Sequence, residues 1–417
     1  MKKNHLMIIV CILTVGFISG CSKTFNKTFG GSGEEVARSA QQTIDGGYIL
    51  AGFTDSYGAG SRDVWLIKTD ANGVEQWDKT FGGLDDDCAH SVQQTKDRGY
   101  ILAGMTRSNG AGSKDVWLIK TDANGNEQWK KPFGGSDEDV ANSVQQTKDG
   151  GYILAGMTRS YGAGITSDVW LIKTNASGET CDYSGDGNCY ENESKWVKTF
   201  GGSGEDGANS VQQTSDGGYI LAGATDAYAG ITSDVWLIKT DAEGVEQWNK
   251  TFSGSGVEQA YSAMQTKDGG YILAGGTDSY GAGNADVWLI KTNASGETCD
   301  YSGDGNCYEN ESKWVKTFGG SGEDFAWSVQ QTKDGGYILA GYIGSSNLWL
   351  IKTDADGVEK WNKTFGSSGW NAATSVHQTK DGGYILAGGT ESYGAGGVDV
   401  WLIKTDAEGN APATPTP

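Results

Sequence analysis

The stretch DGGYILAGGT, from Asp381 to Thr390, recurs with small changes along this chain of 417 residues. Close variants of its GGYILAG core begin at Gly46, Arg98, Gly150, Gly217, Gly269, Gly335 and Gly382. A second apolar run similar to DVWLIKT follows each copy and begins at Asp63, Asp115, Asp168, Asp234, Asp286, Asn347 and Asp399. The intervals between these second runs are 52, 53, 66, 52, 61 and 52 residues, so the chain is a seven-fold array of one unit.

Each unit holds four short runs of the kind that forms β-strands, separated by glycine-rich turns. In typical copies the runs read SVQQT, YILAG, VWLIK and a fourth that ends in KTF. The Asp-Gly-Gly step between the first two suits a tight hairpin, because glycine takes positive φ without steric cost. The second and third runs are almost continuously apolar, as in strands that are covered on both faces.

A four-stranded unit of this size cannot bury both faces alone, but seven of them can stack around a ring. The sequence therefore predicts an all-β fold, a seven-bladed β-propeller of four-stranded antiparallel blades that spans residues 25–410. The last unit lacks its fourth run, and the segment FNKTF at 25–29 matches that run. We expect this N-terminal strand to close the ring and remove the open sheet edge. Residues 411–417, which contain Pro and Thr, are expected to form a disordered tail.

The first twenty residues have the pattern of an export signal. Lys2 and Lys3 precede the apolar run LMIIVCILTVGF, which is short for a membrane span. The next segment, ISGC, resembles the lipobox of prokaryotic lipoproteins, in which the chain is cut before the cysteine and the thiol is lipidated. The resemblance implies a lipoprotein signal peptide at 1–20, a lipid on Cys21 and a short tether at 21–24. We therefore expect an exported protein, lipid-anchored at the cell membrane or cell surface; an ordinary secretory signal is the alternative.

Charge and histidine content narrow the function classes. The chain has 32 basic and 53 acidic side chains, a net charge of -21, which repels nucleic acid and favours neutral glycans, proteins or cations as partners. After the signal peptide only His90 and His377 remain, at non-equivalent positions of two units. A Ser-His-Asp arrangement or a multi-histidine metal site is therefore not expected. Carboxylates are abundant, which keeps a glycosidase-like mechanism open.

Two units carry a cysteine-bounded insert, CDYSGDGNC, at Cys181–Cys189 and again at Cys299–Cys307. The inserts lie in a duplication of residues 168–206 as 286–324. Because the protein is expected to be exported, we predict one local disulfide in each insert, which leaves Cys88 as an unpaired, buried thiol.

The same inserts follow the spacing of a calcium-binding loop, although they lack the flanking helices. Carboxylate and hydroxyl oxygens fall at positions 1, 3, 5 and 12 of the pattern, around a glycine at position 6. Calcium is therefore the cofactor that the sequence suggests, and a plain cross-linked hairpin is the alternative. The candidate ligands are Asp182, Ser184, Asp186 and Glu193 in the first insert and Asp300, Ser302, Asp304 and Glu311 in the second.

The repeat resembles the β-propeller repeats of bacterial and archaeal surface proteins and, more distantly, those of quinoproteins. In the quinoprotein family an Asp, a Gly and a Trp dock adjacent blades, and Asp70, Gly73 and Trp77 match that pattern with one residue fewer between Asp and Gly. The chain has no adjacent cysteine pair and seven units instead of the usual eight, so a bound quinone is not expected. The resemblance implies a fold and leaves the function open.

The turns that join consecutive units are rich in acids. The acids are Glu34, Glu35, Asp85 to Asp87, Asp137 to Asp139, Glu205, Asp206, Glu258, Glu323 and Asp324, with Trp370 and Asn371 in the seventh turn. We expect the last acid of each turn to accept hydrogen bonds from its own loop. A ring that attracts cations near the channel mouth is the alternative.

Recognition is best sought where the copies disagree, since the repeated residues serve the fold. The residue after the recurring Ala of the first run is Arg38, His90, Asn142, Asn209, Tyr261, Trp327 and Thr374 in the seven units. Aromatic residues gather there in units five to seven, and Trp327 and Trp370 are the two of fifteen tryptophans outside fixed repeat positions. The predicted ligand site comprises Tyr261, Phe325, Trp327 and Trp370 with the acids Glu258, Glu323 and Asp324; the alternative is that the rings only fill space.

These observations predict a cell-surface lipoprotein that acts as a non-catalytic binding or adhesion scaffold for glycans or proteins. Aromatic rings flanked by acids can stack on sugars and accept hydrogen bonds from hydroxyl groups. A structural envelope protein and an enzyme that degrades polysaccharides are the alternatives, because a fold alone does not determine a function.

Overall fold

The computed structural model describes residues 23–162, 166–183, 185–228, 232–344 and 346–415. The predicted signal peptide and Cys21 lie outside these residues, so both the signal peptide and the lipidation site stay predictions. The described residues form thirty β-strands and no helix. No helix in this part of the chain could therefore span a bilayer.

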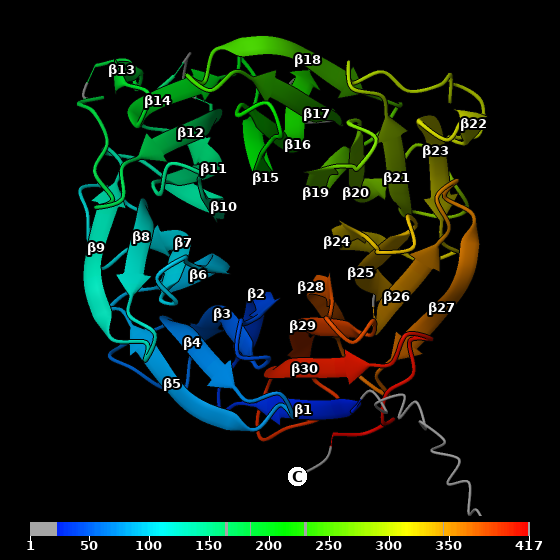
Figure 1. The fold of residues 1–417 in the computed structure, drawn as a ribbon, viewed down its shortest axis with the longest axis horizontal. Coiled ribbons are helices and arrows are strands. Elements are labelled where there is room, and N and C mark those ends of the chain that lie inside the picture. The colour runs from blue at the N-terminus through cyan, green and yellow to red at the C-terminus, as the bar shows by residue number, and fades with distance from the viewer. Residues whose placement is uncertain (1–22, 163–165, 184, 229–231, 345, 416–417) are drawn as a thin grey trace, which may run out of the picture.

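The strands fall into seven sheets arranged as blades around a central channel (Figure 1). Blades one to three contain β2 Glu35–Gln42, β3 Tyr48–Thr54, β4 Asp63–Thr69 and β5 Glu75–Phe81; β6 Asp87–Gln94, β7 Tyr100–Thr106, β8 Asp115–Thr121 and β9 Glu127–Phe133; and β10 Asp139–Gln146, β11 Tyr152–Thr158, β12 Asp168–Thr174, β13 Cys189–Asn192 and β14 Lys195–Phe200. Blades four and five contain β15 Asp206–Gln213, β16 Tyr219–Tyr228, β17 Thr232–Thr240 and β18 Glu246–Phe252; and β19 Glu258–Gln265, β20 Tyr271–Thr277, β21 Asp286–Thr292, β22 Cys307–Asn310 and β23 Lys313–Phe318. Blades six and seven contain β24 Phe325–Gln331, β25 Tyr337–Ile343, β26 Asn347–Thr353 and β27 Glu359–Phe365; and β28 Asn371–Gln378, β29 Tyr384–Thr390, β30 Asp399–Thr405 and β1 Phe25–Phe29.

The predicted seven-bladed β-propeller is confirmed, including its closure. Strand β1 pairs antiparallel with β30, from Phe25 opposite Lys404 to Phe29 opposite Val400, so the first strand of the chain completes the last blade. Every blade has the four predicted antiparallel strands, and blades three and five carry one more. Their disulfide-bounded inserts add the short strands β13 and β22 as a fifth strand at the outer edge.

Each pair of neighbouring blades is joined by an aromatic ring that packs on a turn glycine. The Trp77 ring of blade one lies against the turn that joins the third and fourth strands of blade two, where a Cβ on Gly125 would come within 2.5 Å of it. Gly125 has φ +77°, so this turn needs glycine for its backbone as well as for the ring. Trp77 also meets Tyr100 edge-on, with ring centroids 5.9 Å apart.

This contact recurs at all seven junctions. The pairs are Trp77–Gly125, Trp129–Gly178, Trp196–Gly244, Trp248–Gly296, Trp314–Gly357, Trp361–Gly409 and Phe25–Gly73. The docking pattern implied by the quinoprotein-like repeat is therefore present, and Phe25 takes the part of the tryptophan where the ring closes. Asp70 shapes the turn by accepting hydrogen bonds at Oδ1 from the backbone N–H groups of Asn72 and Val74, at 2.7 and 2.9 Å.

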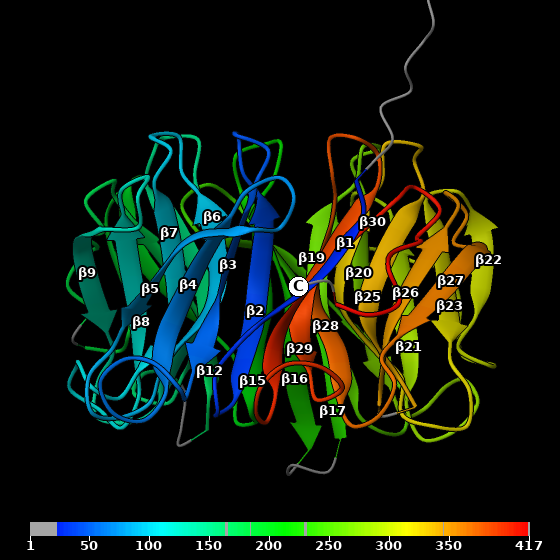
Figure 2. The same ribbon diagram turned by 90° about the horizontal axis from the view of Figure 1, so that it is seen from below.

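The loops gather on two faces of the ring (Figure 2). The mouth face holds the turns that enter each inner strand and the loops between second and third strands; the backbone N–H of Asp55 donates to Glu34 O across these two loops, at 3.0 Å. The hairpin face holds the Asp-Gly-Gly hairpins and the turns between third and fourth strands. Lys23 Nζ donates to Asn72 Oδ1, at 3.2 Å, so the chain enters β1 from the hairpin face.

The C-terminal segment differs from the expected free tail in its described part. Asn26 Nδ2 donates to Pro412 O at 3.0 Å, and the Tyr393 hydroxyl donates to Ala413 O at 3.4 Å. Residues 411–413 therefore lie against blade seven, because hydrogen bonds from strand β1 and from a loop of that blade hold the backbone of Pro412 and Ala413, and Ala411 packs on the core of that region.

Buried acidic residues face each other at the junctions on the mouth face. At the closure, a methyl group on Gly30 would overlap Asp399 Oδ1 and lie 2.8 Å from Glu35 Oε2. Burial and the charge of Glu35 raise the pKa of Asp399 to about 6 from its ordinary value of 3.8. Between blades six and seven both acids are replaced together, by Asn347 and Asn371, which pack around Gly366.

The hairpin face carries charge pairs with the opposite pH dependence. In each blade a buried lysine such as Lys352 holds the hairpin aspartate, here Asp334, at 3.0 Å. Burial works against the ionised form, but hydrogen bonds from Thr332 and Lys352 lower the pKa of Asp334 to about 2. In the wild type the two kinds of pair therefore change the stability in opposite directions with pH. The contribution of the acid pairs is measured by comparing the stability of variants with that of the wild type at each pH.

We predict that deletion of Lys23–Gly31 destabilises the whole ring. Blade seven would lose its outer strand and blade one its docking ring, so we expect the melting temperature to fall by at least about 10 °C. Phe25→Ala, which removes only the buried ring, should cost roughly 3–5 kcal/mol of unfolding free energy. Thermal and urea denaturation followed by circular dichroism would measure both. A deletion variant that melts with the wild type would show that closure is not needed.

We predict that the Asp399–Glu35 pair makes the fold less stable as the pH rises. Between about pH 4 and pH 6 the folded protein keeps the Asp399 proton that the unfolded chain releases, so stability falls with rising pH across that window. Asp399→Asn with Glu35→Gln should remove this term and gain on the order of 1–3 °C over the wild type above pH 6, with no gain below pH 4. Asn347→Asp with Asn371→Asp is the matched control and should add the same pH dependence. Parallel melting curves for all three proteins would refute the idea.

Candidate functional site

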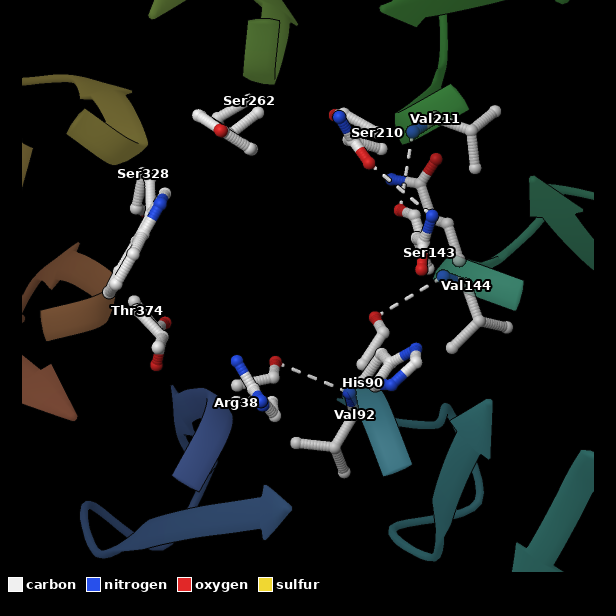
Figure 3. A pocket seen from close by; sticks show the side chains of 18 of the residues that line it. Arg38, His90, Val92, Ser143, Val144, Ser210, Val211, Ser262, Ser328 and Thr374 are labelled. Atoms are coloured by element: carbon white, nitrogen blue, oxygen red, sulfur yellow. Dashed lines mark hydrogen bonds between the residues drawn. The ribbon is translucent and has the colours of Figure 1, made fainter. Parts of the chain in front are cut away.

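The channel is a cavity of about 580 Å³ lined by the first strand of every blade (Figure 3). Its middle layer is a ring of serines, among them Ser143, Ser210, Ser262 and Ser328, which Figure 3 shows around the opening. Each serine oxygen accepts a hydrogen bond from a backbone N–H of the next blade; Ser39 Oγ, for example, accepts from Val92 at 3.2 Å. These serine side chains therefore satisfy backbone N–H groups at the inner edges of the blades.

A β-bulge lies at the same place in all seven inner strands. The pairing register shifts between the recurring Ala and the following Ser, and the residue in between has no partner in the ladder. This extra residue is Arg38, His90, Asn142, Asn209, Tyr261, Trp327 or Thr374. A bulge redirects its side chain, and here all seven line the cavity. The position where the copies disagree most is therefore also the position that the backbone turns toward the channel.

Four of these seven side chains are tied to the next blade. His90 Nδ1, Asn142 Nδ2 and Asn209 Nδ2 each lie 3.0 Å from the carbonyl oxygen of the recurring Ala of the following blade, and Thr374 Oγ1 donates to the equivalent oxygen at 2.7 Å. Burial, followed by the charge of Arg38, lowers the pKa of His90 to about 4, and burial lowers that of His377 to about 4. Both histidines are therefore neutral at pH 7.

The aromatic residues predicted from the sequence come together in one cluster on blades five to seven. Tyr261 lies 6.2 Å from Phe325 between ring centroids, and Trp327 lies 6.4 Å from Trp370. Tyr342 joins the two pairs, at 5.5 Å from Phe325 and 5.1 Å from Trp327. The sequence prediction missed Tyr342. Its signal was available, because Tyr342 opens the shortened GYIGSSN loop at a position where other units vary between Phe, Met, Ala and Gly.

The rings of this cluster differ in what holds them. A Cβ on Gly276 would overlap the Phe325 ring, and one on Gly389 would lie 2.9 Å from the Trp370 ring, so these two rings occupy the space that a glycine leaves. All four rings are half-buried, and of these Trp327 and Tyr261 line the cavity. The space-filling interpretation therefore applies to Phe325 and Trp370, whereas Trp327 and Tyr261 present surface to the channel.

The three acids beside the cluster also differ in their burial and hydrogen bonding. Glu258 is fully buried and accepts from the backbone N–H of Gly254 at 2.9 Å and from Thr277 Oγ1 at 2.9 Å. Asp324 accepts from Gly320 and Gly344, both at 2.7 Å. Both carboxylates are therefore occupied by hydrogen bonds from their own turn and from the neighbouring strand or loop of the same blade, which argues against their placement in the ligand site. Glu323 is exposed.

The expected role of the last acid of each turn is confirmed around the ring. In six turns this carboxylate accepts a hydrogen bond from a backbone N–H of its own loop, and Asn371 contacts the carbonyl oxygens of its loop in the seventh. The six acids are Glu35, Asp87, Asp139, Asp206, Glu258 and Asp324.

The two inserts contain the predicted disulfides, Cys181–Cys189 and Cys299–Cys307, and Cys88 is a free buried cysteine as expected. Asp300 and Asp304 each accept from the backbone N–H two residues ahead, as in ordinary turns.

The calcium-loop pattern is not assembled in the second insert. Asn306 holds the Asp304 turn to Thr317, whereas Glu311 follows β22 at the far end of β23. At about 3.3 Å per residue this separates the two acids by more than 10 Å. The first insert, in which Ser184 lies outside the described residues, has the same arrangement: Asn188 contacts Thr199, and Glu193 follows β13. Asp182 lies at the start of that insert. Among the described residues no three His, Cys, Asp or Glu side chains are grouped as metal ligands.

Comparisons with known proteins give distant similarities. No family model matches the sequence. A segment of 161 residues is 26% identical to the regulatory protein FlaEY of Caulobacter vibrioides, and the match covers 33% of this chain and 17% of FlaEY. The fold is similar to Sqt1 from Chaetomium thermophilum, with a TM-score of 0.46 and 11% identity over 94% of this chain and 87% of that one. It is also similar to the PQQ domain of pyranose dehydrogenase from Coprinopsis cinerea, with a TM-score of 0.40 and 10% identity over 91% and 94%. Function is therefore argued from the site.

We predict that the two kinds of ring respond differently to truncation. Phe325→Ala should lower the unfolding free energy by roughly 2–4 kcal/mol, because it empties the space over Gly276. Trp327→Ala should cost less than about 1.5 kcal/mol, because the Trp327 ring borders a cavity that is already open. Urea denaturation of both variants beside the wild type tests this. Equal losses would mean that Trp327 is a packing residue as well.

Proposed function

We propose that this chain is a non-catalytic binding protein, anchored at the cell surface through a lipid on Cys21, that holds a glycan or protein ligand at the channel mouth. The observation that carries the proposal is the seven-fold bulge. In each blade the bulge directs one side chain into the channel, and these residues differ between blades while the surrounding strands repeat. Such a divergence is typical of recognition surfaces on a common scaffold.

The point where the chain enters the ring supports an orientation in which the channel mouth faces away from the membrane. Residues before Phe25 approach from the hairpin face, where Lys23 contacts Asn72. A lipid on Cys21 would therefore hold the hairpin face toward the membrane. The mouth face, with Trp327 and Tyr261, would then face away from the membrane and remain accessible to ligands.

The acids at the mouth favour binding over hydrolysis. A glycosidase needs two carboxyl groups that reach the scissile bond and exchange protons with the substrate. Glu258 and Asp324 lie beside the aromatic cluster, but their oxygens accept hydrogen bonds from their own loops. Binding through stacked rings and neutral polar groups is therefore the better supported function.

We predict that Trp327→Ala weakens ligand binding by at least about ten-fold with little loss of stability, because a stacking ring and its buried area are worth about 1–2 kcal/mol. The wild type would be screened on a glycan array and against surface extracts, and positive ligands would be measured by calorimetry. Leu84→Ala, in the turn that enters β6 on the same face, serves as the control because Leu84 is 81% exposed, and it should leave the affinity unchanged. Ligands that bind the wild type and Trp327→Ala equally well would place the site elsewhere.

A further inference from the structure

A second cavity of about 440 Å³ opens on the mouth face over blade four, beside the channel mouth. The two cavities share Asn142, Asn209 and Tyr261 as lining residues. The two cavities are therefore adjacent across these side chains, and the second is a groove that leads from the channel rim outward over blade four.

The floor of this groove exists because blade four has small residues at two variable positions. One is Gly207, which occupies the position held by Val36, Cys88, Val140, Gln259, Phe325 and Ala372 in the other blades. A Cβ on Gly207 would meet only Met157, at 3.8 Å, so this position borders open space. The other is Ala224, at the position that carries Phe53 in blade one and Tyr342 in blade six. In those blades, large side chains occupy the corresponding volume.

One wall of the groove is a hairpin that is longer than its counterparts. Strands β16 and β17 have 10 and 9 residues, against 7 for the corresponding strands of blade one, and pair as far as Tyr228 opposite Thr232. Figure 2 shows them extending beyond the other blades on the mouth face. Ser233 ties this hairpin to the neighbouring blade through a parallel bridge with Val257 and a hydrogen bond to Glu258 O at 3.3 Å.

Most of the polar side chains that line the groove are uncharged. Its polar side chains include Asn142, Ser167, Asn209, Ser233 and Gln259, which are amides and hydroxyls. Two acids also line the groove. Glu205 pairs with Arg159 at 3.2 Å and accepts from Ser167 Oγ at 2.5 Å, and the buried Asp206 accepts from the backbone N–H of Gly202 at 3.0 Å.

Backbone edges are not available here for pairing with a peptide. At the groove the backbone N–H of Asp206 donates to Ser167 O at 2.7 Å. Further along β15 the backbone N–H of Val211 donates to Ser143 Oγ at 3.2 Å, and β17 is paired on both sides.

The amides and hydroxyls of the lining hold hydrogen bonds within the protein, as Asn142 and Asn209 do to the next blade. Recognition in the groove therefore depends on their remaining N–H groups and lone pairs and on the Tyr261 ring face. These groups match the hydroxyl-rich, uncharged surface of a sugar chain better than the backbone of an extended peptide.

We infer that the groove and the channel mouth together form an extended site for a linear, uncharged oligosaccharide, with Tyr261 at the bend between them. This inference rests on the proposed binding function and gives its ligand a chemical class and a direction. One end of the chain stacks against Trp327 at the mouth, and the following sugars lie along the groove over Gly207. Affinity therefore increases with ligand length until the groove is filled.

The test uses neutral β-1,4-linked glucose and N-acetylglucosamine oligomers, from the disaccharide to the hexasaccharide, titrated calorimetrically into the exported protein. We expect at least ten-fold tighter binding of the hexasaccharide than of the disaccharide. Gly207→Leu should abolish this gain and leave disaccharide binding unchanged; other blades carry Val or Phe here, so the fold accepts the larger side chain. Val36→Leu, the same repeat position in blade one, is the control and should behave as the wild type does.

The outcomes separate this inference from the proposed function. Binding that is sensitive to Trp327→Ala but does not depend on ligand length or on Gly207→Leu overturns the groove and keeps the site at the mouth. Binding of peptides at the mouth with no binding of either sugar series overturns the ligand class. Sugar binding that Trp327→Ala leaves unchanged overturns the proposed function itself.

Discussion

The fold depends on the contact between an aromatic ring of one blade and a turn glycine of the next. A single blade buries only part of its apolar strands, so it is stable only between two neighbours. The ring-on-glycine contact sets the spacing between blades at every junction, since a side chain at Gly125 or its equivalents would push the neighbour away. The last contact, Phe25 on Gly73, joins residues from the start of the chain to the first full blade and makes the array cyclic.

The positions of the repeat unit divide into those that build the ring and those whose residue differs between blades. The polar residues of SVQQT, which would be unusual in the middle of a sheet, belong to the first group. Their side chains accept hydrogen bonds from backbone groups of the adjacent blade, as Gln41 Oε1 does from Gln94 at 2.7 Å. The bulge residue makes no ladder pair, so it can change from Asn to Trp without disturbing the sheet. Sequence variation therefore concentrates at the channel mouth.

The blade number, strand order and closing strand could be predicted from the sequence because repetition makes each unit a check on the others. The aromatic cluster could be predicted in part, since Trp327 and Trp370 break the repeat. Tyr342 also departs from the other units in the sequence, but only the structure shows that its ring lies between the two ring pairs. The hydrogen bonds that occupy Glu258 and Asp324 could not be predicted, because a sequence does not show whether a carboxylate is bonded to its own loop or free. The fifth strands β13 and β22 were missed because a disulfide-bounded insert carries no apolar alternation that marks a strand. The groove over Gly207 depends on what a missing side chain leaves open, which only the packed structure shows.

The closing strand also has a mechanical meaning. Strand β1 enters from the hairpin face at Phe25 and leaves toward the mouth face at Phe29, so it crosses the thickness of the ring. If the lipid holds the chain before Phe25 and a bound ligand is pulled from the opposite face, the tension runs along the length of β1. The hydrogen bonds between β1 and β30 are then loaded together in shear and not opened one after another. Strand β1, which completes the ring, would thus also bear the tension between the lipid anchor and the bound ligand.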